Sequence, residues 1–361
     1  MKTIKTIAIT AIALVMGLSA CNKEEGFDAS SDNFNVTLAF KKSPATRADG
    51  LLAVSGTKVT IDNGYLCFVS ASDYITDVYT ISSAATLDKN IQNSALGTTA
   101  VTIENVPGSS VKVAMIVNTG TNAALSAPVI GQSIVAYMYK NMDVKDQGDY
   151  TLVTATGSAA LVATADPQEK TANIQLETKV SRIQIEDLCF DSAIATAKVE
   201  GIFINGYYAN MQLDGTASSF VKSNIAANYA SGSATFPLGL STFVYDMVGN
   251  YFVDSKVEPV NGVWGYNLFT SATPQIIIKF SEILINDQLL SDPQFVTING
   301  FRDGFGKNIT SIEGGMIYTI SAGDLVIKSE HFSPEPGILP ISVNVTVETV
   351  EWDETKVFPN L

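Results

Sequence analysis

Apolar and polar residues alternate with a period of two over many short stretches of this chain. Two stretches show the pattern most clearly, and each has four apolar positions. In the first, these positions are Phe34, Val36, Leu38 and Phe40. In the second, near the C-terminus, they are Ile341, Val343, Val345 and Val347. Since a period of two places alternate side chains on one face of a strand, each stretch is predicted to be a strand with one buried face.

Further strand-like runs, separated by turn-forming residues, fall into two series. The first comprises 58–61, 65–70, 101–103, 111–117, 150–156 and 173–176. The second comprises 180–185, 200–204, 275–280, 316–320 and 325–327. No stretch sustains the 3.6-residue period of a helix. The pattern therefore predicts an all-β fold of two tandem antiparallel β-sandwich domains.

A polar stretch at 166–170, which contains Pro167, separates the two series and predicts the domain boundary. The N-terminal sandwich is then expected over 48–170 and the C-terminal sandwich over 171–340. Pro334, Pro336 and Pro340 precede the last alternating strand. Because proline favours an extended chain and cannot donate to a sheet ladder, the segment 341–361 is expected to be held away from the preceding domain.

Composition supports a sheet protein and argues against one class of partner. Of the 361 residues, 46% are hydrophobic and only 16% are charged, a balance that suits half-buried sheet surfaces. The formal net charge is -14 and no cluster of Lys and Arg occurs. Since binding to nucleic acid requires basic residues that neutralise phosphates, no nucleic-acid partner is expected.

The first 20 residues have the features of a bacterial signal peptide. Lys2 and Lys5 precede an apolar run over 7–18, which is too short to span a bilayer. The run ends in Leu18-Ser19-Ala20-Cys21, which resembles the lipobox of bacterial lipoproteins. This resemblance implies cleavage before Cys21, acylation of that cysteine with diacylglycerol and palmitate, and a precursor anchored at the outer membrane.

The segment between Cys21 and the first domain contains a candidate protease site. Residues 22–33 are polar and acidic and are expected to form a tether. The loop after the first strand contains Arg47 followed by Ala48. Only two other arginines occur in the chain. Arg182 lies in an alternating strand and should be protected, whereas Arg302 is the second candidate for cleavage.

No pattern of catalytic, cofactor-binding or metal-ligating residues appears. His331 is the only histidine, and Gly304-Phe305-Gly306 lacks the remaining glycine and the helix of a phosphate-binding loop. Cys67 and Cys189 both lie in apolar strands and are interpreted as buried thiols, with a disulfide as the alternative. We therefore expect no cofactor, no metal and no enzymatic activity.

The order of these features resembles the fimbrillin family, the shaft subunits of type V pili. The resemblance rests on the Cys21 motif, on Ala45-Thr46-Arg47-Ala48-Asp49-Gly50, on Gly314-Gly315-Met316-Ile317-Tyr318-Thr319-Ile320 and on the segment 343–352. It implies transthyretin-like, Greek-key sandwiches, transport to the outer membrane and cleavage after Arg47 by an extracellular Arg-specific protease. It also implies removal of the propeptide 21–47 with its first strand, and donation of the C-terminal strand to a neighbouring subunit.

The two alternating strands support that mechanism independently of the resemblance. Their apolar positions match in number and spacing, so the later strand could occupy the pockets vacated by the earlier one. Burial of four such side chains contributes about 6–12 kcal/mol before opposing terms. The expected product is a cell-surface fimbrium that supports adhesion. Its partners would be other copies of the chain, related fimbrial subunits and a host or bacterial surface ligand.

Two other interpretations remain open from the sequence. The chain could be a tip or anchor subunit of the same system, although by family analogy an anchor would lack the cleavage and a tip would lack the donor strand. It could also be a surface lipoprotein that binds glycans through exposed aromatic residues such as Trp264 and Tyr266. Packing of these aromatics in a core or a turn is the competing explanation.

Overall fold

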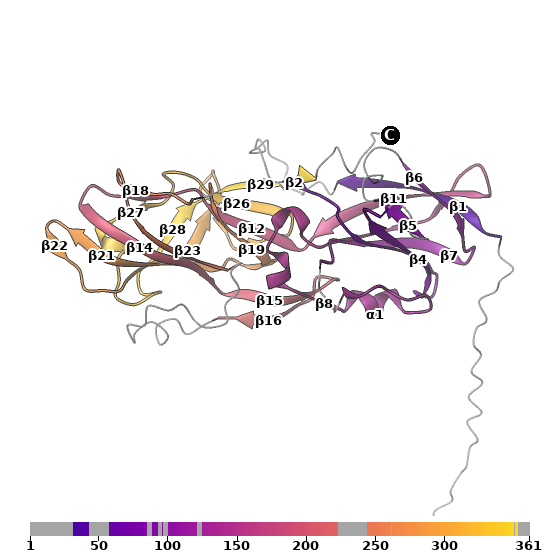
Figure 1. Cartoon of the computed structure of the whole chain (residues 1–361), viewed down its shortest axis with the longest axis horizontal. Coiled ribbons are helices and arrows are strands. Elements are labelled where there is room, and N and C mark those ends of the chain that lie inside the picture. Colours follow the sequence, from indigo (N-terminus) through magenta and orange to yellow (C-terminus); the bar gives the residue numbers. More distant parts are fainter. Residues whose placement is uncertain are drawn as a thin grey trace, which may run out of the picture.

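The computed structural model describes residues 32–42, 58–84, 89–92, 96, 100–120, 125–222, 244–260, 262–349 and 351–352. The all-β prediction is confirmed, since strands dominate and helical segments are short. The molecule is elongated, with an N-terminal and a C-terminal half arranged end to end (Figure 1). Within the described residues, no helix is long and apolar enough to cross a membrane.

The N-terminal half is built on one nine-stranded sheet, in the order β5-β4-β3-β7-β9-β11-β1-β6, with β10 paired to β11. Its strands are β1 (Phe34–Lys42), β3 (Gly64–Ser70), β4 (Ile75–Ser82), β5 (Asn90–Gln92), β6 (Val101–Val106), β7 (Ser110–Val117), β9 (Ala155–Ala160), β10 (Val162–Ala163) and β11 (Glu169–Thr178). The short helix α1 (Ile134–Met138) covers part of one face. Its N-cap residue Ser133 accepts a hydrogen bond from the Ala136 amide.

Strand β11 connects the two parts of this sheet. It pairs with β1 along most of its length and with β9 only at Glu177 and Thr178. Gly157 of β9 permits this close crossing, because a Cβ atom there would lie 2.3 Å from the Gln175 carbonyl oxygen. The core therefore lies between β3, β7 and β9 on one side and β1, β6 and β11 on the other.

The C-terminal half contains two larger sheets. The four-stranded sheet has the order β19-β12-β26-β29, and the seven-stranded sheet has the order β17-β14-β21-β23-β24 with β22 and β28 paired at its margins. The members of the first are β12 (Val180–Ile185), β19 (Trp264–Phe269), β26 (Met316–Ile320) and β29 (Thr346–Thr349). Those of the second are β14 (Ile194–Asn205), β17 (Tyr245–Tyr251), β21 (Gln275–Ile285), β22 (Gln288–Leu289), β23 (Gln294–Arg302), β24 (Asn308–Ile309) and β28 (Pro340–Asn344).

Smaller sheets complete the fold. Two of them are three-stranded: one has the order β18 (Lys256–Val257), β13 (Leu188–Phe190), β27 (Val326–Ile327), and the other has the order β16 (Ala217–Val221), β15 (Tyr207–Gln212), β8 (Asn141–Asp143). Two more are two-stranded: β20 (Ser271–Ala272) pairs with β25 (Ser311–Ile312), and β2 (Lys58–Val59) pairs with β30 (Glu351–Trp352). The 3₁₀ turns are η3 (Val144–Gln147), η4 (Tyr150–Leu152) and η5 (Ser329–His331).

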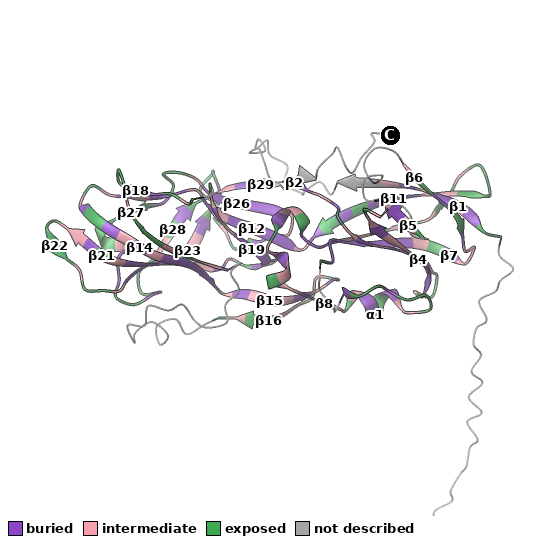
Figure 2. Cartoon of the chain, viewed as in Figure 1, coloured by how far each residue is buried: buried purple, intermediate pink, exposed green. Residues whose placement is uncertain are grey.

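One hydrophobic core extends through both halves. Its buried side chains form a continuous cluster, seen as the purple inner faces in Figure 2. Hydrogen bonds also cross the junction, where the Asn267 amide donates to the carbonyl oxygens of Gln147 and Gly148 at 2.7 and 3.0 Å. Strand β8 from the N-terminal half pairs with β15 from the C-terminal half. The halves are therefore joined by both packing and strand pairing.

Two features differ from the sequence predictions. The sheets are mixed, since β1 with β11, β12 with β26, and β23 with β28 are parallel pairs. The boundary predicted at residue 170 falls inside β11, and the chain changes sheet at Lys179. The polar stretch around Pro167 forms the turn between the paired strands β10 and β11. Turns and interdomain linkers are rich in the same residue types, so the sequence pattern does not distinguish them.

Candidate functional site

Strand β1 is an internal strand that is bonded on both sides. It runs parallel to β11 from Asn35, opposite Glu169, to Lys42, opposite Leu176. It runs antiparallel to β6 from Phe34, opposite Val106, to Leu38. The beginning of the described chain therefore completes the N-terminal sheet by lying between two strands that are distant in sequence.

The apolar side of β1 enters the core as the alternation predicts. Val36 and Leu38 are fully buried and Phe34 is 5% exposed. The Phe34 ring also lies 3.6 Å from the Lys170 ammonium, measured to the ring centroid, which is within cation-π distance. Phe40 lies opposite Ile174 in the backbone register, and its side chain is outside the described residues.

Strands β6 and β11 form the two walls of this site. Ile103 and Val106 of β6 and Ala172 and Ile174 of β11 are buried beside β1. The sequence predicted part of each segment as a strand, at 101–103 and 173–176, but not their pairing with β1. Parallel pairing between residues more than 100 positions apart leaves no local signal in a sequence.

Strands β28 and β29 of the C-terminal segment pack on their own C-terminal half, whereas β30, the last described strand, pairs with β2 of the N-terminal half. Strand β28 runs parallel to β23, the Val345 amide donates to the Arg302 carbonyl oxygen at 2.8 Å, and β29 then pairs with β26. Both β28 and β29 lie at sheet edges. Val343, Val345 and Val347 are 2–6% exposed and Ile341 is half-buried.

This arrangement corrects the expectation that the segment is held away from its domain. The prolines before it do not keep it apart, because an edge strand needs ladder bonds on one side only. Three of the four alternating apolar positions, Val343, Val345 and Val347, are instead buried in the core of the chain itself, and Ile341 packs against it.

The other assembly residues predicted from the sequence lie outside the described part of the chain. Cys21, Arg47 and Ala48 are among them. Of the remaining arginines, Arg182 is half-buried in β12 and donates to Gln184 and Asn267 at 3.0 and 3.2 Å. Arg302 is exposed at the end of β23, where both neighbouring strands hold its backbone.

The aromatic residues considered for sugar binding are buried. Trp264 is 7% exposed and Tyr266 is inaccessible, so they cannot form a stacking platform at the surface. Burial raises the pKa of the Tyr266 hydroxyl well above its ordinary value, with a further contribution from the Asp246 carboxylate. Core packing, the competing explanation, is correct for both residues.

The remaining reactive side chains do not form a cluster. Cys67 is buried, Cys189 is partly buried, and both are free thiols rather than a disulfide. His331 is half-buried in η5, where its Nδ1 accepts a hydrogen bond from the Lys328 amide at 3.2 Å. Among the residues the structure describes, no three His, Cys, Asp or Glu side chains lie close enough to hold a metal ion.

Solved structures provide the comparison for this fold. No protein-family model matches the sequence, and no curated protein matches it. A "putative cell adhesion protein" from Bacteroides eggerthii is similar over 89% of this chain and 97% of its own, with a TM-score of 0.54 and 15% identity.

Two proteins with the same description from Parabacteroides distasonis are also similar over 89% of this chain. One is covered over 97% of its own length, with a TM-score of 0.56 and 11% identity. The other is covered over its whole length, with a TM-score of 0.51 and 12% identity. The chain therefore shares its fold with these putative cell adhesion proteins, which is consistent with the family resemblance seen in the sequence.

Proposed function

We propose that this chain is a non-enzymatic structural subunit of a bacterial surface fimbrium and that it polymerises by strand exchange after cleavage at Arg47. The fold that it shares with putative cell adhesion proteins supports a surface role. The observation that carries the proposal is the position of β1 between β6 and β11, near the start of the described residues.

Removal of β1 would leave a gap one strand wide, with an unpaired ladder on each side. Neighbouring strands lie about 4.8 Å apart, so β6 and β11 are too far from each other to pair across that gap. The space left by Val36 and Leu38 would be apolar. An extended segment with alternating apolar residues restores both ladders and fills the pockets, which is the chemistry of strand addition.

The C-terminal segment is the proposed donor. Because β28 and β29 are edge strands, their withdrawal would break one ladder in each of the two larger sheets and leave the order of the other strands unchanged. Withdrawal of the whole segment would also break the short pairing of β30 with β2. Withdrawal also exposes Val343, Val345 and Val347, so the segment stays docked until a vacant site offers equivalent burial. Donation thus competes with the intramolecular packing of the same side chains.

The remaining parts of the proposal follow the sequence. Acylation of Cys21 anchors the precursor at the outer membrane, and an extracellular Arg-specific protease releases residues 21–47. The mature chain then starts at Ala48 and joins other copies or related fimbrial subunits at the cell surface.

The mature N-terminus tests the proposal directly. Fibrous material sheared from the cell surface is digested and its N-terminal peptide is sequenced by mass spectrometry. We expect a chain that starts at Ala48 in high-mass polymers. A polymer whose chains retain acylated Cys21, or a mature protein found only as monomer, would refute the mechanism.

A further inference from the structure

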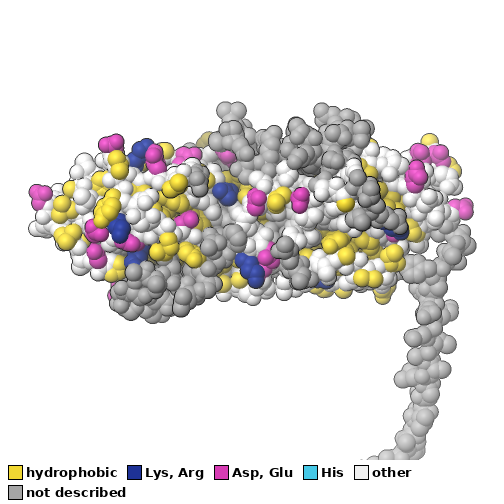
Figure 3. Space-filling view, viewed as in Figure 1, with side chains coloured by type: hydrophobic (Ala, Val, Ile, Leu, Met, Phe, Trp, Pro, Cys, Tyr) yellow, Lys and Arg dark blue, Asp and Glu magenta, His cyan; other side chains and the backbone are white. Residues whose placement is uncertain are grey.

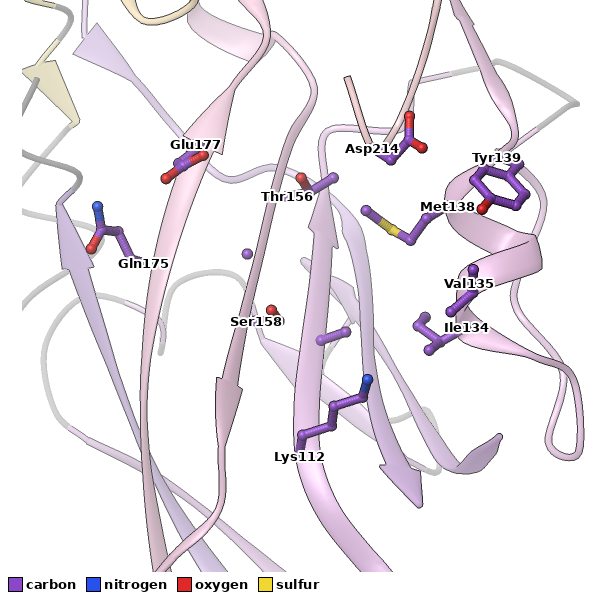
Figure 4. Close-up of a pocket in the computed structure, with 12 residues that line it drawn as sticks. Lys112, Ile134, Val135, Met138, Tyr139, Thr156, Ser158, Gln175, Glu177 and Asp214 are labelled. Carbon is purple, nitrogen blue, oxygen red and sulfur yellow. The ribbon is translucent and has the colours of Figure 1, made fainter. Parts of the chain in front are cut away.

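An open pocket lies where the two halves meet, beside helix α1. Its volume is about 580 Å³, which is within the range of small-ligand sites, about 300–1,000 Å³. Strands β7, β9 and β11 form its floor and α1 forms one wall. Asp214, in the turn between β15 and β16, closes one end (Figure 4).

The pocket exists because the floor carries small or polar side chains. In the register of these strands, Ala114 of β7 lies opposite Ser158 of β9, and Thr156 of β9 lies opposite Glu177 of β11. These positions share the outer face of the sheet. Ile134 and Tyr137 of α1 are buried over the neighbouring strands, while the floor beyond them stays open.

The junction of the two halves fixes the shape of the pocket. The Asp214 amide donates to the Met138 carbonyl oxygen and the Leu213 amide donates to the Lys140 carbonyl oxygen, both at 3.1 Å. These bonds hold the β15–β16 turn against the end of α1. A pocket between packed structural units is a common place for a ligand site.

The lining offers both stacking and hydrogen bonding. Tyr139 is 55% exposed at the lip, and Val135 and Met138 extend the apolar wall. Val129 and Ile130, also exposed, continue this apolar surface in the segment before α1, and Figure 3 shows hydrophobic side chains gathered on this part of the N-terminal half. Opposite the apolar wall, the pocket is lined by the polar residues Thr156, Ser158, Gln175 and Glu177.

Most charges in the pocket are already paired. The Lys112 ammonium contacts the Asp73 carboxylate, and the Lys179 ammonium lies 3.3 Å from the Glu177 carboxylate. Asp214 accepts a hydrogen bond from the Thr216 amide at 2.8 Å. A strongly charged ligand therefore finds no concentrated opposite charge, whereas hydroxyl groups find several hydrogen-bonding partners.

From these features we propose that the pocket binds a neutral sugar unit of a surface glycan. One face of the sugar ring packs on Tyr139 and the apolar wall, and the sugar hydroxyls bond to Ser158, Thr156 and Asp214. The inference adds a ligand class to the adhesive side of the proposed function. It does not depend on cleavage or polymerisation, since the pocket is complete in a single chain.

The test uses the full-length monomeric chain on an array of neutral oligosaccharides containing galactose, glucose, mannose and their N-acetylated amino sugars. The Kd of the best ligand is then measured by calorimetry. We expect Tyr139→Ala and Ser158→Leu each to weaken binding at least about tenfold, the first by removing the stacking ring and the second by filling the floor. Tyr74→Ala is the matched control, because Tyr74 is exposed but does not line the pocket.

Circular dichroism of each variant confirms that it is folded. Failure to bind every neutral oligosaccharide would overturn the proposal, as would binding that neither variant weakens. Binding of an oligolysine peptide through Tyr139 in place of any sugar would assign the pocket to a cationic partner instead. Because the chain is uncleaved in this experiment, failure here leaves the assembly mechanism intact, and failure of assembly leaves sugar binding intact.

Discussion

At the scale of single residues, the side chains of β1 show how far alternation determines packing. Val36 and Leu38 are fully buried, whereas Thr37 between them is half-buried and contacts Thr102 across the strand pair at 3.3 Å. The apolar positions on β1 were thus identified from the sequence. The Lys170 contact with Phe34 was not, because it depends on the register of a distant strand.

Replacement of Leu38 by Ala should destabilise the uncleaved chain by about 2–5 kcal/mol, because it leaves a cavity in a fully buried site. Chemical denaturation measures the change. Thr37→Ala, one position along on the outer face, should cost much less. If Leu38→Ala and Thr37→Ala lowered the free energy of unfolding equally, β1 would not be packed in the sheet as described.

The thiols provide a second test at this scale. Burial raises the pKa of Cys67 to about 12, and burial, followed by the Asp187 carboxylate, raises the pKa of Cys189. Only the thiolate reacts with iodoacetamide, so at pH 8 the native chain should leave Cys67 unmodified and Cys189 only slowly modified. Peptide mapping after alkylation measures the extent of modification of each cysteine. In the unfolded protein, Cys67 and Cys189 should be alkylated at equal rates.

The same pKa shift has a defined effect on stability. The Cys67 thiol is neutral in the fold at pH values where the unfolded thiol, with an ordinary pKa of 9.0, ionises. Its contribution to stability is therefore complete below pH 9 and is lost as the pH rises toward 12. Cys67→Ser would remove this alkaline loss, and rapid alkylation of native Cys67 would contradict the buried position.

At the scale of elements, the sequence predicted strands better than their partners. The ranges 180–185 and 316–320 match β12 and β26, because alternation and buried runs are local signals. Residues 150–156 were assigned to one strand, but η4 occupies Tyr150–Leu152, where Asp149 caps the turn by accepting from the Thr151 amide. Strand order and parallel pairing depend on contacts between distant residues, so no local pattern reveals them.

The C-terminal segment gives the sharpest prediction for an element. Because Val345 is 2% exposed in its own chain, Val345→Asp should lower the free energy of unfolding of the monomer by about 3–5 kcal/mol. It should also abolish polymers. Asn344→Asp, at an exposed neighbouring position, is the control. It should change neither the free energy of unfolding of the monomer nor the formation of polymers.

Thermal melts of the uncleaved monomer and SDS-resistant ladders of the processed protein measure the two effects separately. Unchanged melting of Val345→Asp would show that the segment is not docked on its own half in solution. Normal ladders from this variant would show that it is not the donor.

At the scale of the whole molecule, strand β1 near the start of the described chain and the segment β28–β29 near its end are both strands that the sheets could lose. One is internal and bonded on two sides, and the other runs along two sheet edges. Under the proposed mechanism, cleavage would set the order of events in assembly, since β1 occupies its site as part of the same chain and would exclude any donor until it leaves.

Arg47→Ala should give a folded, surface-located precursor that retains β1 and forms no polymer. Cell-surface fractions analysed by native mass and by N-terminal peptide mapping measure both properties. Arg302→Ala is the matched control, because it removes an exposed arginine from the C-terminal half and should polymerise normally. High-mass polymers from the Arg47 variant would mean that assembly does not require loss of β1.

The double-sided bonding of β1 also has a mechanical consequence. A strand pulled along its own axis between two neighbours must break both rows of hydrogen bonds together, whereas a strand peeled from an edge breaks them one at a time. A donor strand seated between β6 and β11 would be loaded in shear whenever the fibre is stretched along its length. In the proposed fibre, the site between β6 and β11 would thus also give the joint between subunits its resistance to tension.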